Sequence, residues 1–118
     1  MIEKTLISFL INKTSALDNV FAERPEEVPA SYIVLEKTGS NTENMITTST
    51  VAIQSCCDSM QGKSFLDAAE LNEELKDAME DLIALDDIVM VDLNSDYNYT
   101  DNTTKEYRYQ AVYEITHY

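Results

Sequence analysis

Oxygen-bearing side chains recur at every second position in one short stretch near the C-terminus, DLNSDYNYTD. Asp92, Asn94 and Asp96 have the spacing of the first three ligands of an EF-hand calcium loop. The rest of that pattern fails, because Tyr97 stands where the sharp turn needs glycine and Thr103 stands where a bidentate glutamate is needed. We therefore interpret the stretch as a turn between two strands, since Asn, Ser and Asp commonly initiate turns. We expect no metal there.

Few other residues could act as a nucleophile or a base. His117 is the only histidine, and no serine or cysteine lies in a nucleophile motif such as G-x-S-x-G. Two glycines cannot build the glycine-rich loops that bind phosphate groups. Cys56 and Cys57 are adjacent and lack C-x-x-C spacing, so we expect two ordinary thiols. The sequence therefore predicts no catalytic residue and no cofactor.

Carboxylates are abundant, and many lie on one predicted helix. From Ser64 to Leu85 the apolar residues recur at helical spacing, and Ser64 with Asp67 forms an N-terminal capping signal. The opposite side of this helix is acidic, with Asp67, Glu70, Glu73, Glu74, Asp77, Glu80 and Asp81. Like charges at i,i+4 each destabilise an isolated helix by about 0.2–0.5 kcal/mol, so packing of the apolar side must hold it. The acidic side is either a solvated surface or a surface that faces a basic partner or the interior of an assembly.

Two helices and four strands account for the remaining patterns. Ile2–Lys13 predicts a short amphipathic helix, and Thr14–Ala30, which holds both prolines, predicts a connection with a brief extended piece at Val20 and Phe21. The predicted strands are SYIVLEKTG, ending at Gly39, then MITTSTVAIQSCC, IVMVDL and YRYQAVYEITHY. The order α-β-β-α-β-β favours an α+β fold, with two helices on one face of a mainly antiparallel, roughly four-stranded sheet. We expect a single domain over residues 1–118.

The final strand has the clearest alternation. Tyr107, Tyr109, Ala111, Tyr113 and Ile115 fall on one face of it, while Arg108, Gln110 and Glu114 fall on the other. The tyrosines of this region are expected either to pack across strands or to form part of a protein interface, where tyrosine is enriched. By contrast, the polar, threonine-rich stretch from Gly39 to Thr50 predicts a hairpin arm that extends beyond the core.

The charge of the chain limits its partners. The 118 residues carry a formal net charge of −14, which disfavours specific nucleic-acid binding through a basic patch. The N-terminal apolar run LISFLI is too short for a secretion signal, and nothing approaches the length of a membrane span. We therefore expect a protein that acts inside a cell, in a reducing compartment, without a membrane partner.

Four segments together resemble a known family. YIVLEKTG, VAIQSCCDS, AAELNEELKDAM and NSDYNYTDNTTKEYRYQAVYEITHY, in this order and spacing, resemble the tail-completion proteins of long-tailed phages and prophages of Gram-positive bacteria. These small structural proteins are also called tail terminators or tail-to-head joining proteins. The resemblance covers nearly all of the chain from about Tyr32 and is strongest at the C-terminus. It includes no catalytic signature.

The resemblance implies a compact α+β subunit that forms a ring, often six-fold, at the head-proximal end of the tail. Such a ring stops polymerisation of the tail tube and joins the tail to the head. It implies four partners: copies of the chain itself, the tail tube protein, the head-side neck connector, and DNA that passes through the lumen without specific binding. The expected location is the host cytoplasm during assembly and then the neck of the virion.

We add two expectations to that implied role. Glu70, Glu73, Glu74 and Asp77 are the first candidates for acids that face the lumen or a partner, where they would keep DNA from adhering. The candidate interface arm contains Asn41, Glu43, Asn44, Thr47 and Thr48. The competing hypothesis is an acidic regulatory or inhibitor module that mimics nucleic-acid charge and binds a basic DNA-handling protein with salt-sensitive affinity.

Overall fold

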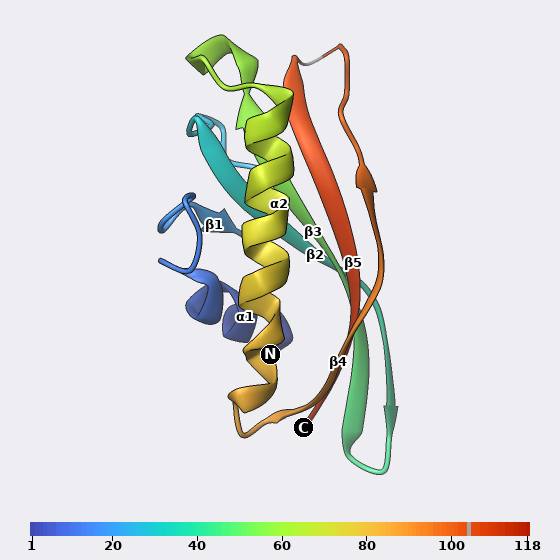
Figure 1. Cartoon of the computed structure of the whole chain (residues 1–118). Coiled ribbons are helices and arrows are strands. Elements are labelled where there is room, and N and C mark those ends of the chain that lie inside the picture. The colour runs from blue at the N-terminus through green and yellow to red at the C-terminus, as the bar shows by residue number, and fades with distance from the viewer. Residues whose placement is uncertain (104) are drawn as a thin grey trace.

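A five-stranded sheet forms the centre of the fold, and both α-helices lie on one of its faces (Figure 1). The structure, a computed structural model, describes residues 1–103 and 105–118. Its elements are α1 (Ile2–Leu10), β1 (Val20–Phe21), β2 (Ser31–Glu43), β3 (Ile46–Asp58), the short 3-10 helix η1 (Ser59–Gln61), α2 (Phe65–Glu80), the 3-10 helix η2 (Leu82–Ala84), β4 (Ile88–Asn98) and β5 (Glu106–His117). The α+β class expected from the sequence is confirmed.

The sheet has the order β1-β2-β3-β5-β4. All neighbouring pairs are antiparallel except β1 and β2, which run parallel and pair at Val20↔Ile33 and Phe21↔Val34. The expected count of four strands is therefore wrong by one, and the sheet is mixed. Strand β1 has only two residues, which is too short to show an alternating pattern. The sequence could therefore indicate an extended piece at Val20 and Phe21 but not its parallel pairing with β2.

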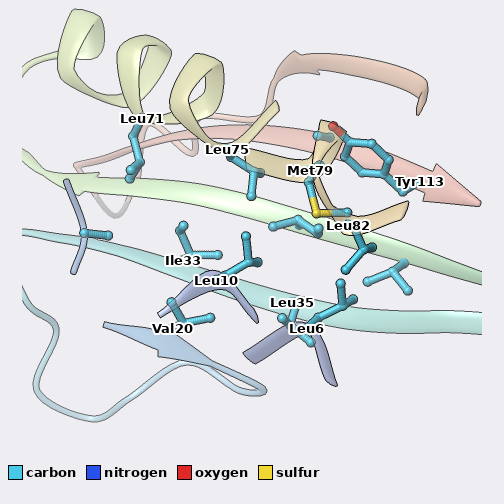
Figure 2. Close-up of a cluster of buried hydrophobic side chains, with 14 of the residues drawn as sticks. Leu6, Leu10, Val20, Ile33, Leu35, Leu71, Leu75, Met79, Leu82 and Tyr113 are labelled. Atoms are coloured by element: carbon cyan, nitrogen blue, oxygen red, sulfur yellow. The ribbon is translucent and has the colours of Figure 1, made fainter. Parts of the chain in front are cut away.

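The core lies between the helices and the sheet. Apolar side chains of α1 (Leu6 and Leu10) meet those of α2 over the sheet, as Figure 2 shows for Leu75 and Met79. The predicted inward face of the last strand is confirmed, because Ala111, Tyr113 and Ile115 are buried and Tyr107 and Tyr109 pack against the core. At the end of the sheet where β2 begins, side chains are buried on both faces, since Tyr32 and Cys56 are also buried on the face away from the helices.

Helix α2 begins as the sequence predicts and ends earlier. The Ser64 side chain accepts from the Asp67 backbone amide, and the Asp67 carboxylate accepts from the Ser64 amide at 2.8 Å, so the capping box is present. The helix stops at Glu80, and the chain turns through η2 toward β4 instead of continuing to Leu85. Acids crowd this C-terminal end, where the helix dipole disfavours them. The turn nevertheless buries Leu82, so the apolar pattern of the sequence persists past the true end of the helix.

Two strands extend beyond their predicted ends. Strand β2 continues past Gly39 to Glu43, and the glycine lies at a register shift between Lys37 and Gly39. It therefore marks an irregularity within the strand and not its end. Strand β4 continues from Leu93 to Asn98, with register shifts between Ile88 and Met90 and between Leu93 and Ser95. The stretch DLNSDYNYTD, expected to be a turn, is therefore mostly strand.

Candidate functional site

The hairpin of β2 and β3 projects from the body of the protein as an arm, here defined as residues 36–50 (Figure 1). The five predicted arm residues all lie on it, and the pairs Asn41↔Thr48 and Thr42↔Thr47 hold its two strands in register. Every residue from Glu36 to Met45 is exposed. The two threonines of the second pair share a hydrogen bond of 2.8 Å. The arm is thus a two-stranded structure, paired continuously from Gly39 to its turn, whose first strand contributes nothing to the core.

The turn at the tip of the arm places two non-glycine residues in the left-handed region. Asn44 has φ 52° and Met45 has φ 67°, between the paired residues Glu43 and Ile46. Two positive φ values define the hairpin turn that matches strand twist, and Asn-Gly is its preferred sequence. Asparagine tolerates this conformation, whereas methionine is strained in it. The strained residue is also 87% exposed, so the tip presents an apolar side chain to the solvent.

The C-terminal strand supports the arm on one side only, along nearly all of the arm's second strand. Strand β5 pairs with β3 as far as Thr47↔His117, and the His117 Nε2 atom lies 2.9 Å from the Ser49 hydroxyl. His117 therefore contacts the second strand of the arm. The other edge of the arm is open, because β1 pairs with β2 only at Ile33 and Val34. Strand β4 ends the sheet at the opposite side, so two strand edges lack a partner in the described chain.

The four predicted acids of α2 border one shallow surface depression of about 440 Å³. Glu70, Glu73 and Asp77 are exposed, and Glu73 pairs with the Lys76 ammonium at 2.9 Å. Glu74 is different, because its Oε2 accepts hydrogen bonds from both the backbone N–H and the hydroxyl of Ser15, each at 2.8 Å. It joins α2 to the turn after α1. The structure thus brings the four acids together and gives one of them a structural contact.

A larger groove of about 650 Å³ lies between the C-terminal half of α2, η2 and β4. Its floor includes the buried Met79 and Tyr113, which lie close together in Figure 2. Its walls carry side chains that are half exposed, namely Ile83 at 50%, Val89 at 43%, Met90 at 49% and Leu93 at 43%. The acids on its rim are Glu73, Asp77 and Glu80. The sequence missed this groove because no local pattern indicates that the end of α2 and η2 lie beside β4.

The three oxygen-bearing residues that resemble calcium ligands do not form a loop. Asp92, Asn94 and Asp96 all lie in β4, and the register shift after Leu93 separates them. The Asp96 carboxylate instead accepts from the Lys76 ammonium and the Asn72 amide, both at 2.9 Å. The Lys76 ammonium lowers the pKa of Asp96, and that carboxylate in turn raises the pKa of Lys76. Across residues 1–103 and 105–118, no group of three potential metal ligands comes together.

Sequence reasoning also missed a buried ionic cluster on the face away from the helices. Glu106, only 3% exposed, accepts a hydrogen bond of 2.6 Å from the Tyr32 hydroxyl and one of 3.2 Å from Arg24. Arg108 lies 3.6 Å from its other oxygen and also contacts the Tyr99 ring. Burial raises the pKa of Tyr32 well above its usual range, so the hydroxyl stays a donor. The contacts of Glu106 with Tyr32 and Arg24 join residues 74 and 82 positions apart in the sequence, which no local pattern indicates.

The two cysteines are free thiols, as expected, and both are buried. Burial raises the pKa of Cys56 to about 12 and also raises the pKa of Cys57. Thiolate is the reactive form of cysteine, so neither side chain has the environment of a nucleophile.

Comparison with known proteins finds no significant match. The chain matches no protein-family model, and no curated protein is significantly similar to it. Among the described residues, no helix is both long enough and apolar enough to span a membrane.

Proposed function

We propose that this protein is a structural subunit that assembles with copies of itself into a ring at the head-proximal end of a phage tail. The ring stops polymerisation of the tail tube and joins the tail to the head. The observation that carries this proposal is the arm of residues 36–50, which is long, has an exposed first strand and is tipped by an apolar side chain. An exposed arm of this kind is a means of reaching a neighbouring subunit and not a means of stabilising its own core.

The position of the open strand edges supports a ring. One open edge is the outer side of β2 in the arm, and the other is β4 at the opposite side of the sheet. A contact between two different surfaces of identical subunits is head-to-tail, and such contacts close into rings when the rotation permits. Exposed strand edges readily pair with another chain. In this arrangement the arm of one subunit reaches the next subunit or the tail tube protein.

The acids of α2 give such a ring a negative surface. Glu70, Glu73 and Asp77 are exposed on the outer side of the helix. In the proposed ring they face the lumen, where they repel DNA during its passage. The head-side neck connector and the tail tube protein are the remaining partners of the ring. After assembly in the host cytoplasm, the subunit becomes part of the virion neck.

Removal of the arm tests the proposal. In the test variant, Asn41–Thr48 is replaced by Asn-Gly, which closes a shorter hairpin at the existing pair Ser40↔Ser49. Light scattering after size exclusion should show a ring-sized oligomer for the natural chain, alone or on tail tubes, and a monomer for the variant. The matched control is Glu26→Ala/Glu27→Ala, two exposed acids outside the arm, which should assemble normally. A natural chain that stays monomeric and never binds tube protein would contradict the proposal.

The acidic surface of α2 also favours a second candidate, a module that mimics nucleic-acid charge and binds a basic DNA-handling protein. Such a module works as a monomer or a dimer and does not need the arm. Recovery of a nuclease or repressor with salt-sensitive affinity, equally by the natural chain and the arm variant, would favour this candidate over the ring.

A further inference from the structure

We propose that the groove between α2, η2 and β4 is a docking site for a basic amphipathic helix of another protein. This inference goes beyond the ring and does not depend on it. The groove opens on the face of the sheet that bears the helices, because Leu93 and Tyr113 are paired residues and Tyr113 packs under α2. The open backbone edge of β4 points along the plane of the sheet instead. The groove and the strand edge can therefore be occupied at the same time.

The apolar content of the groove is what separates it from a solvated surface. Ile83, Val89, Met90 and Leu93 are each exposed by 43% or more, and all four line the same hollow. Scattered exposed apolar residues are normal, but a contiguous group around a hollow is typical of an interaction site. Since Met79 and Tyr113 close the bottom, apolar side chains of a partner would find an apolar floor.

The charge of the groove rim favours a basic partner. Glu73, Asp77 and Glu80 line the helical rim, and only Lys76 is a base among the lining residues. That lysine is already bound to Asp96 and Glu73, each at 2.9 Å. A partner with Lys or Arg beside its apolar residues would place cations against the acids of this rim. Charge complementarity of this kind increases association rate and specificity.

A second copy of the chain does not fit this requirement. The chain has only eight Lys and Arg residues, and Arg24, Lys76 and Arg108 are held in ion pairs. The other five are at least nine residues apart in the sequence, so no short segment of a copy carries a basic face. The arm tip itself carries Glu43 two residues before Met45, which would bring acid against acid. The occupant is therefore a different protein.

The shape of β4 favours a helix over an added strand. Its register shifts, between Ile88 and Met90 and between Leu93 and Ser95, flank the stretch that lines the groove. Such irregularities bend and twist the strand where it lines the groove, so an occupant of the groove meets its side chains and leaves its backbone edge free. An amphipathic helix that lays residues i, i+3, i+4 and i+7 into a groove needs only side-chain contacts.

A designed peptide tests the inference directly. The probe is a fluorescein-labelled Leu/Lys peptide of about 14 residues with leucines at helical spacing, and its control is a scrambled peptide of the same composition. Fluorescence anisotropy should show saturable, salt-sensitive binding of the probe and much weaker binding of the scrambled peptide. Equal binding of both peptides would show charge attraction without docking and would overturn the proposal.

Three variants locate the site. Ile83→Asp/Leu93→Asp places charge in the wall, and Asp77→Lys/Glu80→Lys reverses the rim; each should weaken binding at least about tenfold. Glu26→Lys/Glu27→Lys makes the same change in charge on exposed acids far from the groove and should keep the affinity within about twofold. If this control weakens binding as much as the rim variant, the groove is not the site.

Because a wall variant could unfold, methyl resonances of the natural chain provide a second readout. Shifts confined to Ile83, Val89 and Leu93 are expected, and shifts elsewhere without them would overturn the docking site.

Discussion

The hydroxyl of Tyr32 donates a 2.6 Å hydrogen bond to the Oε2 atom of Glu106, and both side chains are almost completely buried. This contact joins the start of β2 to the start of β5 across the intervening β3. The same carboxylate holds Arg24 in the connection before β2 and faces Arg108 in β5. One glutamate therefore holds together one end of the sheet and the connection that leads into it.

Loss of the Tyr32 hydroxyl should destabilise the protein. Tyr32→Phe removes a hydrogen bond to a charged, buried acceptor, and we expect the free energy of unfolding to fall by about 1.5–3 kcal/mol. Denaturant titration measures this loss. The control is Tyr97→Phe, because the Tyr97 hydroxyl makes its hydrogen bond with Gln110 on an exposed part of the sheet. A change in Tyr97→Phe as large as that in Tyr32→Phe would contradict the special role of the buried acceptor.

Alkaline pH should weaken the fold through the buried thiol. The pKa of Cys56 is raised to about 12 in the folded chain from an ordinary value of 9.0, so the unfolded chain loses this proton first. Between about pH 9 and pH 12 the unfolded state binds fewer protons, and the free energy of unfolding falls as pH rises. Cys56→Ala should make this slope less steep in urea titrations at a series of pH values. An unchanged slope would show that Cys56 does not contribute to it.

The ion pair between Lys76 and Asp96 should couple α2 to the edge strand β4. Both side chains are partly exposed, at 22% and 28%, so a double-mutant cycle with Lys76→Met and Asp96→Asn should give a coupling of about 1 kcal/mol or less. The pKa of Asp96 is lowered in the folded chain, so this stability is present above its ordinary value of 3.8 and is lost as pH falls below it. A coupling that persists undiminished at pH 2 would contradict this assignment.

A single change at the arm tip should separate stability from assembly. Met45→Gly relieves a strained positive φ, and we expect the subunit to gain about 1 kcal/mol of stability. It also removes the apolar side chain that the proposed ring presents to a neighbour, so the oligomer should weaken. Thermal unfolding of the monomer and sedimentation of the assembly measure the two effects. Asn44→Gly, beside it in the same turn, is the control and should leave assembly intact.

Reversal of the exposed acids should affect DNA passage and leave folding unchanged. Glu70→Lys/Glu73→Lys/Asp77→Lys changes three exposed side chains, and in the proposed ring it should slow DNA ejection without preventing ring formation. Glu74 is kept, because its contacts with Ser15 are structural. Normal infectivity of a phage that carries the reversed ring would reject the lumen-facing position of these acids.

The sequence predicted elements with a strong period and missed those that depend on distant partners. Leu71, Leu75 and Met79 are buried where helical spacing places them, and Tyr113 and Ile115 are buried where strand alternation places them. The end of α2 at Glu80 was missed because Leu82 continues the apolar pattern from within a different element. The extension of β4 to Asn98 was missed because Asn, Ser and Asp are typical of turns, whereas pairing with β5 holds them in a strand.

The candidate sites show the same division. The arm could be anticipated, since its threonines alternate without enough apolar residues to form part of a core. The groove beside β4 could not, because its walls combine three elements whose bounds or partners were unknown. The contacts of Glu106 could not be predicted either, because nothing in the sequence distinguishes this acid from the others or indicates that Tyr32 and Arg24 surround it.

The structure of the arm determines how its length can change during evolution. Its outer strand from Glu36 to Glu43 is exposed along its whole length and paired only within the hairpin. Insertion or deletion of two residue pairs, two residues in each strand, would preserve which side chains face each way and alter the reach by about 6.6 Å. The hairpin is thus an adjustable spacer, and related subunits could adapt to assemblies of different diameter while keeping the same folded body.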